Sequence, residues 1–400
     1  MTLKFGRDQV SIPGPSVIPD RVLRAMHRAS PNIYEGDLID LANGLYPDLN
    51  RIAKNSGDVA LYIGNGHAAW EASLTNTLSR GDTVLVLITG RFGRGWMDMA
   101  EFLGVNVQSI DFGADLPADP ATVKDALAAD SNHKIKAVLT VQTDTASSVC
   151  NDIPALRRVL DETGHPALLM VDCMASLGCE PFYMDDWGVD VMLAGCQKGL
   201  MTPAGVAFTF IRGDKVWKAY EQAALKTPYW DWDRRLNGAF FHQKFCGTPP
   251  THQLYGLREA LDILLEETIE NTWHRHRVLA SAVWAAVDAW GKVDHGMSCN
   301  VAATAHRSLA VTTIKTQDGE AASIRRWCED QAGLTLGVGL DLESTLGGQS
   351  DRLFRIGHMG HLNPPMLLGT LATVDCALKA LHIDHGAGAL DAACAAVAAG

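Results

Sequence analysis

Short apolar runs alternate with amphipathic stretches through the first half of the chain. The runs have the length and composition of buried strands, and seven of them lie at Val59–Ile63, Thr83–Ile88, Val105–Ile110, Lys136–Val141, Ala167–Asp172, Val189–Ala194 and Val206–Phe210. Helical spacing falls between them, most clearly in His67–Ser79 and Trp96–Leu103. This alternation predicts an α/β fold, in which helices cover both faces of a mostly parallel seven-stranded sheet.

The pattern changes on either side of this region. Residues 1–18 include Pro13, Gly14 and Pro15, which predict an irregular arm. Short helices are expected over 20–28 and 38–56, and a long polar and aromatic loop over 226–250. Residues 251–291 have a nearly unbroken helical pattern, which predicts one long helix or two.

A smaller α+β domain is expected after these helices. The predicted elements are strands at 308–314 and 352–356, a helix at 321–331 and a glycine-rich loop. The Ala/Gly-rich tail, 386–400, is expected to be poorly ordered or a frayed helix. The predicted organisation is therefore an arm (1–18), a large domain (19–267) and a small C-terminal domain (268–400).

Composition narrows the class of protein. Of 400 residues, 47% are hydrophobic and 20% charged, which is typical of a soluble globular protein. The net charge of −12 argues against binding to nucleic acid or to anionic membranes. The sequence shows no signal peptide and no apolar run long enough for a membrane span. Nine cysteines without a CxxC pair indicate reduced thiols in a cytoplasmic protein, not a zinc site or a disulfide framework.

Two polar residues follow buried runs in the middle of the chain. Asp172 closes one run, and Lys198 comes shortly after the end of another. Ligands of open α/β sheets bind at the carboxyl ends of strands. An acid and a lysine brought together there suit pyridoxal phosphate, which needs a carboxylate at its pyridine nitrogen and an amine for its aldehyde. Taken singly, the Asp is more often a helix cap and the Lys a solvated surface residue.

Several tracts carry a resemblance to a known family. VDCMASLG (171–178) and AGCQKGLM (194–201) resemble the class V, fold-type I aminotransferases, in particular the alanine–glyoxylate and serine–glyoxylate group. IPGPSVIPDRVLRAM, GNGHAAWEASLTNTLSRGD and FRIGHMG also have counterparts there. The resemblance implies a homodimer with shared active sites. It also implies a pyridoxal phosphate enzyme that moves an amino group from serine, alanine or aspartate to glyoxylate or pyruvate.

The resemblance also implies roles for individual residues. Lys198 would form the Schiff base and move the substrate proton, and Asp172 would pair with the pyridine nitrogen. Gly66, His67 and Gln197 would bind the cofactor phosphate, together with Thr248 from the partner subunit. Phe92 would stack on the ring, and Thr145 would lie near the phenolic oxygen. Arg355 would bind the substrate α-carboxylate. Phe245 stands where the group often has a tyrosine that serves the phosphate.

Two tracts depart from the group. In the group, the region that corresponds to Pro31–Asp37 contains an Asp-His-Arg tract of the substrate pocket, which this chain lacks. Tyr34 in this region and the RIGHMG tract are instead similar to features of pyridoxamine–pyruvate aminotransferase, whose reaction is the alternative function. Gln197 and Gly66-His67 favour a true phosphate site. Leu340–Ser350 is longer and more polar than expected. A pyridoxal phosphate lyase such as a desulfurase is a further alternative, for which Cys328 is the nearest candidate nucleophile in sequence.

Overall fold

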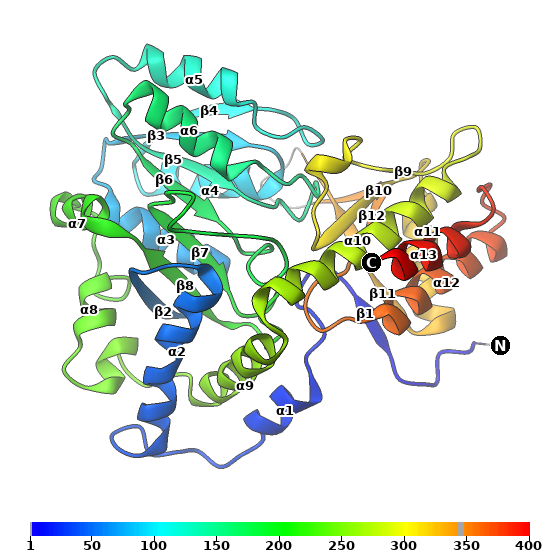
Figure 1. Cartoon of the computed structure of the whole chain (residues 1–400), viewed down its shortest axis with the longest axis horizontal. Helices are drawn as coiled ribbons and strands as arrows, with labels where there is room; N and C mark the ends of the chain where they lie inside the picture. Colours follow the sequence, from blue (N-terminus) through cyan, green and yellow to red (C-terminus); the bar gives the residue numbers. More distant parts are fainter. Residues whose placement is uncertain (1, 343–347) are drawn as a thin grey trace.

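The computed structural model describes residues 2–342 and 348–400. The chain forms two packed bodies, each built on its own sheet (Figure 1). The large body holds β2 (Asp58–Gly64), β3 (Thr83–Ile88), β4 (Asn106–Asp111), β5 (Ile135–Val141), β6 (Leu168–Asp172), β7 (Val191–Gly195) and β8 (Gly205–Ile211). The small body holds β1 (Gln9–Ser11), β9 (Ser298–Cys299), β10 (Val311–Lys315), β11 (Leu334–Leu340) and β12 (Gln349–Gly357).

The strand order of the large sheet is β2-β8-β7-β6-β5-β3-β4. Only β8 runs against its neighbours, so the predicted mostly parallel seven-stranded sheet is confirmed. All seven predicted strands are present, within a few residues at their ends. The runs are continuously apolar because both sheet faces are buried, as in other parallel sheets.

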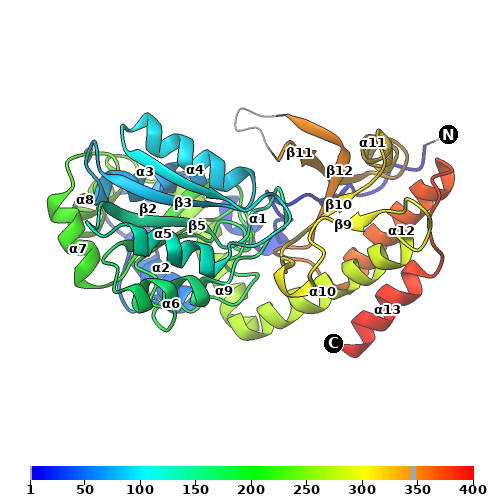
Figure 2. The same cartoon turned by 90° about the horizontal axis from the view of Figure 1, so that it is seen from above.

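Helices cover the two faces of this sheet (Figure 2). One face carries α3 (Gly66–Thr77), α4 (Arg91–Phe102), α7 (Gly213–Gln222) and α8 (Trp232–Asn237). The other carries α2 (Asp37–Ala53), α5 (Pro120–Ala129), α6 (Ile153–Thr163) and α9 (Thr251–Glu267), with α1 (Asp20–Met26) packed on α9. Along β3, Leu85 and Leu87 face one core while Val84 and Val86 face the other, as strand alternation requires.

The small body has a separate core. Its five strands are ordered β1-β11-β12-β10-β9, and its helices are α10 (Ile269–Trp290), α11 (Glu320–Ala332), α12 (Pro364–Ala380) and α13 (Ala389–Ala399), with a short 3-10 turn, η2 (Thr304–His306). The helical tract at 251–291 is two helices, because Thr268 has a left-handed φ of 70° between α9 and α10. The boundaries at residues 18 and 267 remain predictions.

Four sequence expectations were wrong in part. Residues 1–18 include a strand, β1, which pairs in parallel with β11. The expected loop at 226–250 contains α8 and a 3-10 helix, η1 (Phe241–Phe245). The expected glycine-rich loop of the small body is strand β11. There Gly339 is required because a Cβ would lie 2.1 Å from the carbonyl oxygen of Leu353.

The fourth correction concerns the tail. Residues 389–399 form α13, which packs along α10 and buries Ala389 and Ala393 completely or nearly so. Small side chains allow this close helix packing, so the Ala-rich composition is a packing feature and not a sign of disorder. The Leu340–Ser350 tract begins in β11 and ends in β12, and residues 343–347 lie outside the described part of the chain.

None of the described helices has both the length and the apolar character that a membrane crossing requires.

Candidate active site

A cavity of about 210 Å³ lies at the carboxyl edge of the large sheet. The segments that follow β2, β3, β5, β6 and β7 meet there, since these strands run in the same direction. The lining residues are Asn65, Gly66, His67, Trp70, Phe92, Val141, Thr143, Thr145, Asp172, Met174, Ala175, Gln197 and Lys198. Seven of the predicted site residues are thus brought to one place from five separate tracts.

Asp172 is held rigidly at the end of β6. Its side chain is buried, and its two oxygens accept hydrogen bonds from the Met174 backbone N–H at 2.6 Å and the Trp70 indole N–H at 2.7 Å. Burial raises the pKa of Asp172 to about 6, although both hydrogen bonds oppose that rise. The carboxylate is therefore ionised at neutral pH and is suited to pair with a cationic ligand atom.

Lys198 faces the same cavity from the turn after β7. Its ammonium nitrogen donates a hydrogen bond to the carbonyl oxygen of Pro13 in the N-terminal arm. Burial and, to a lesser extent, the positive charge of Arg355 together lower the pKa of Lys198 to about 8. A lysine with this pKa has a useful fraction of neutral, nucleophilic amine near neutral pH.

The arm covers Lys198 closely. Gly14 has a left-handed φ of 96°, and a Cβ at this position would lie 2.4 Å from the lysine side chain. The Ser16 hydroxyl also donates a hydrogen bond of 2.6 Å to the carbonyl oxygen of Lys198. The Pro-Gly-Pro tract thus forms a wall of the site, which is more specific than the arm expected from sequence.

One end of the cavity is built to receive an anion. It is formed by the first turn of α3, where the Asn65 side chain caps the backbone N–H of His67 at 3.1 Å. Backbone N–H groups and the helix dipole favour negative charge there. Nearby, the Gln197 side-chain oxygen is buried and has no hydrogen-bond partner among the described residues, so its amide group is free to turn toward a ligand.

Arg355 lies beside the cavity on β12 of the small body. It is buried, and its guanidinium donates to the carbonyl oxygens of Val338 at 2.7 Å and Thr145 at 2.8 Å. Burial lowers its pKa to about 10, so it remains a cation at neutral pH. Only two of its five N–H donors are used by these bonds, and the rest remain for a ligand carboxylate.

Two predicted residues lie away from the cavity in this chain. Tyr34 is 73% exposed and contacts the ring of His242 edge-on at 5.5 Å. Thr248 is exposed in the turn before α9. Phe245 is buried in the core against Phe241, so it contributes packing there. Roles for Tyr34 and Thr248 stay predictions that require a second chain.

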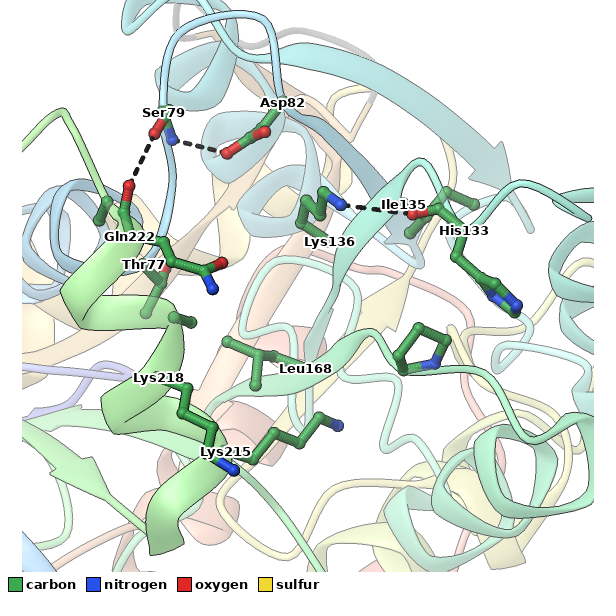
Figure 3. Close-up of a pocket in the computed structure, with 13 residues that line it drawn as sticks. Thr77, Ser79, Asp82, His133, Ile135, Lys136, Leu168, Lys215, Lys218 and Gln222 are labelled. Atoms are coloured by element: carbon green, nitrogen blue, oxygen red, sulfur yellow. Dashed lines mark hydrogen bonds between the residues drawn. The ribbon is translucent and has the colours of Figure 1, made fainter.

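A larger cavity, of about 560 Å³, lies at the opposite, amino edge of the sheet (Figure 3). Lysines 136, 215 and 218 surround it, together with the polar residues Ser79 and Gln222. Lys215 is already bound to Asp190 and to the Ala167 carbonyl. This cavity lies at the amino edge of the strands, whereas ligands of open α/β sheets bind at the carboxyl edge, and the charge of its Lys215 is already paired with Asp190. We therefore place the candidate active site in the smaller cavity.

Comparison with known proteins agrees with this geometry. Residues 64–343 match the family model described as Aminotransferase class-V. The chain belongs to the class V aminotransferase family. It is therefore an enzyme of the pyridoxal phosphate-dependent type, and the predicted fold-type I architecture is confirmed.

Individual relatives of this aminotransferase cover nearly all of its length. It is 40% identical to serine–glyoxylate aminotransferase of Methylorubrum extorquens, over 96% of this chain and 93% of that one. It is 34% identical to L-aspartate–glyoxylate aminotransferase of Paracoccus denitrificans, over 94% and 92%. Pyridoxamine–pyruvate aminotransferase of Mesorhizobium loti has a similar structure, with a TM-score of 0.89, 25% identity and full coverage of both chains.

Sequence reasoning missed three residues that organise the site of this aminotransferase. Trp70 fixes Asp172, as described above. Asp144, buried, accepts hydrogen bonds from the first backbone N–H groups of α4, including that of Phe92 at 2.7 Å. Glu180, also buried, accepts from the hydroxyl of Thr143 at 2.8 Å and from groups of the small body. Nothing local marks them, since each acts on an element remote in sequence.

Proposed function

We propose that this aminotransferase moves the amino group of a small L-amino acid, such as serine, alanine or aspartate, to glyoxylate or pyruvate. The observation that carries the proposal is the placing of the Lys198 amine and the Asp172 carboxylate on one cavity that ends at the first turn of α3. The substrate classes follow those named for the relatives in Methylorubrum and Paracoccus.

The residues of the cavity fit pyridoxal phosphate. The side-chain N–H of Gln197 and the helix N-terminus at Gly66 and His67 would hold the phosphate. Asp172 would pair with the ring nitrogen, and Phe92 would stack on the ring face. Thr145 lines the wall where the phenolic oxygen is expected.

Lys198 would hold the cofactor by its aldehyde and later carry the reacting proton. When bound, pyridoxal phosphate supplies an electron sink for the substrate α-carbon. The amine of Lys198, with its pKa near 8, would accept the proton from that carbon and hold it for transfer to the cofactor. Arg355 would bind the substrate α-carboxylate and so point the C–H bond at the amine.

A homodimer in the cytoplasm completes the proposal. Thr248 and Tyr34 are exposed, and the rings of Tyr34 and of the 64% exposed Phe240 both contact the ring of His242. An aromatic surface of this kind suits a partner subunit, and Thr248 would reach the partner's phosphate site across it. All nine cysteines are free thiols, which suits a reducing compartment.

Chemical trapping tests the proposal directly. Borohydride reduction of the cofactor-loaded protein should fix a pyridoxyl group on Lys198, and Lys198→Ala should remain unlabelled. Mixing the loaded enzyme with single amino acids should then convert the cofactor to its amine form, followed by absorbance. A protein that binds no cofactor, or that is labelled elsewhere, would contradict the proposal.

The second candidate is a pyridoxamine–pyruvate reaction. It is favoured by the similarity of the whole chain to the Mesorhizobium loti structure. The helix N-terminus at Gly66 and His67, in the same cavity as Gln197, favours a phosphorylated cofactor instead. Adding pyridoxamine and pyruvate to the cofactor-free protein distinguishes the two, because only the second candidate should form pyridoxal and alanine.

A desulfurase is disfavoured by the structure around its candidate nucleophile. Cys328 is fully buried on α11, and burial raises the pKa of its thiol to about 12. A thiol in that state is a poor nucleophile, because the thiolate is the reactive form.

A further inference from the structure

A second arginine, Arg91, is the first residue of α4 and directly precedes Phe92 in the wall of the cavity. The next residue, Phe92, lines the cavity and donates its backbone N–H to Asp144 at 2.7 Å. Arg355 is anchored one residue further along the same turn, on the carbonyl oxygen of Thr145 at 2.8 Å. The buried turn at Asp144 and Thr145 therefore holds both the start of α4, which carries Arg91, and the guanidinium of Arg355.

Arg91 has no partner among the residues that the structure describes. It is half-buried, yet its side chain takes part in no hydrogen bond and no ion pair there. By contrast, Arg94, one turn further along the same helix, pairs with Asp111 at 2.5 Å. A half-buried guanidinium with all its donors unused is uncommon, because desolvation of a charge needs compensation.

Positive charge is concentrated around this wall of the cavity. The charge of Arg91 lowers the pKa values of both His67 and Arg355, after the larger effect of burial, which places Arg91 within electrostatic reach of both ends of the cavity. Arg325 of α11 adds to the same field at Arg355, and the buried carboxylate of Asp144 opposes it. In a protein of net charge −12, this local excess favours a ligand with more than one negative charge.

We propose that Arg91 binds the side-chain carboxylate of the amino donor, and that the enzyme therefore prefers a short dicarboxylic amino acid of the aspartate class. Arg355 takes the α-carboxylate and Arg91 the distal one. A planar guanidinium suits this task because it binds a carboxylate through two parallel hydrogen bonds. The inference rests on the proposed function and narrows its donor.

Half-reactions of the cofactor-loaded enzyme test the specificity. In Arg91→Gln the second-order rate constant with aspartate should fall about 10- to 100-fold, while that with alanine should stay within about threefold. Arg91→Lys keeps the positive charge but loses the paired N–H donors of the guanidinium, so its rate constant with aspartate should lie between those of the wild type and Arg91→Gln. Arg94→Gln is the matched control on the same helix and should leave the rate constants with both amino donors unchanged.

Two outcomes would overturn the assignment. An equal loss with both donors, together with weaker binding of pyridoxal phosphate, would place Arg91 at the phosphate instead. No loss with aspartate would show that Arg91 does not reach the donor.

Binding of unreactive acids separates this inference from the proposed function. By calorimetry, the loaded wild-type enzyme should bind succinate more tightly than propionate, and Arg91→Gln should remove the difference. If no amino acid reacts but the difference persists and depends on Arg91, the proposed function fails and the carboxylate site stands. If amino acids react but the binding of succinate does not depend on Arg91, the inference about Arg91 fails while the proposed function stands.

Discussion

The indole N–H of Trp70 donates a hydrogen bond of 2.7 Å to Asp172. Trp70 lies on α3, whose first turn forms the anion end of the cavity, and Asp172 ends β6. This one bond fixes the spacing between the expected phosphate site and the expected partner of the ring nitrogen. A rigid cofactor needs both at a set separation, so the bond acts on affinity as well as on orientation.

Removing the indole donor should weaken cofactor binding. Trp70→Phe keeps an aromatic ring in the core but leaves one carboxylate oxygen without its partner. The dissociation constant of pyridoxal phosphate should rise about 10- to 100-fold, since a hydrogen bond to a charged group contributes roughly 1.5–3 kcal/mol. Trp96→Phe is the control, because the buried Trp96 indole N–H has no partner in the described structure. Equal effects of the two substitutions would refute the role of the bond.

Capture of the cofactor should depend on pH through Lys198. A neutral amine is needed, and it predominates above the pKa of about 8. At pH 7 roughly one amine in ten is then neutral, against roughly one in three thousand for an unperturbed lysine. The rate at which added pyridoxal phosphate becomes reducible onto Lys198 should therefore rise about tenfold from pH 7 to pH 9 and level off above the pKa.

The same experiment on Arg355→Gln checks the cause of the shift. Without that positive charge the pKa of Lys198 should be higher, so the profile should move to higher pH. An unchanged midpoint would show that burial alone sets the reactivity of the lysine.

Glu180 should contribute strongly to the stability of the folded protein, because it joins the large and small bodies by buried hydrogen bonds. One of its oxygens accepts from the hydroxyls of Thr143 and Ser308 and from the Leu309 backbone N–H, which joins the two bodies. Glu180→Ala leaves these buried donors unpaired and should lower the free energy of unfolding by about 3 kcal/mol in urea titrations. Glu221→Ala, at an exposed glutamate, should change it by less than about 0.5 kcal/mol.

A methyl group on Gly14 should disturb the lysine. Gly14→Ala places a Cβ against the Lys198 side chain in a backbone conformation that favours glycine. Cofactor capture should slow about 100-fold, as expected when a reacting group is displaced by an ångström. Gly6→Ala, with nothing within 4 Å, is the control and should behave as wild type. Normal capture in Gly14→Ala would show that the arm moves aside freely.

The fold was largely predictable because the sheet strands are continuous apolar runs. The strand around Asp172 could be located from local pattern alone, and the family tracts identified the lysine. Trp70 and Glu180 could not be found this way, since their importance comes from partners remote in sequence. Strand β1 was missed for the same reason: three residues before a Pro-Gly-Pro tract become a strand only because β11 lies beside them.

Pairing between β1 and β11 also sets the order in which the enzyme matures. The arm is synthesised before the large body, but the strand that anchors it begins at Leu334, after all the strands of that body. Until then the arm lacks this pairing, and Pro13 is kept near the amine of Lys198 by the Ser16 hydrogen bonds to Gln197 and Lys198. The nascent chain therefore carries an incomplete site until β11 has been made, and competence to bind the vitamin should arise only after that strand has paired with β1.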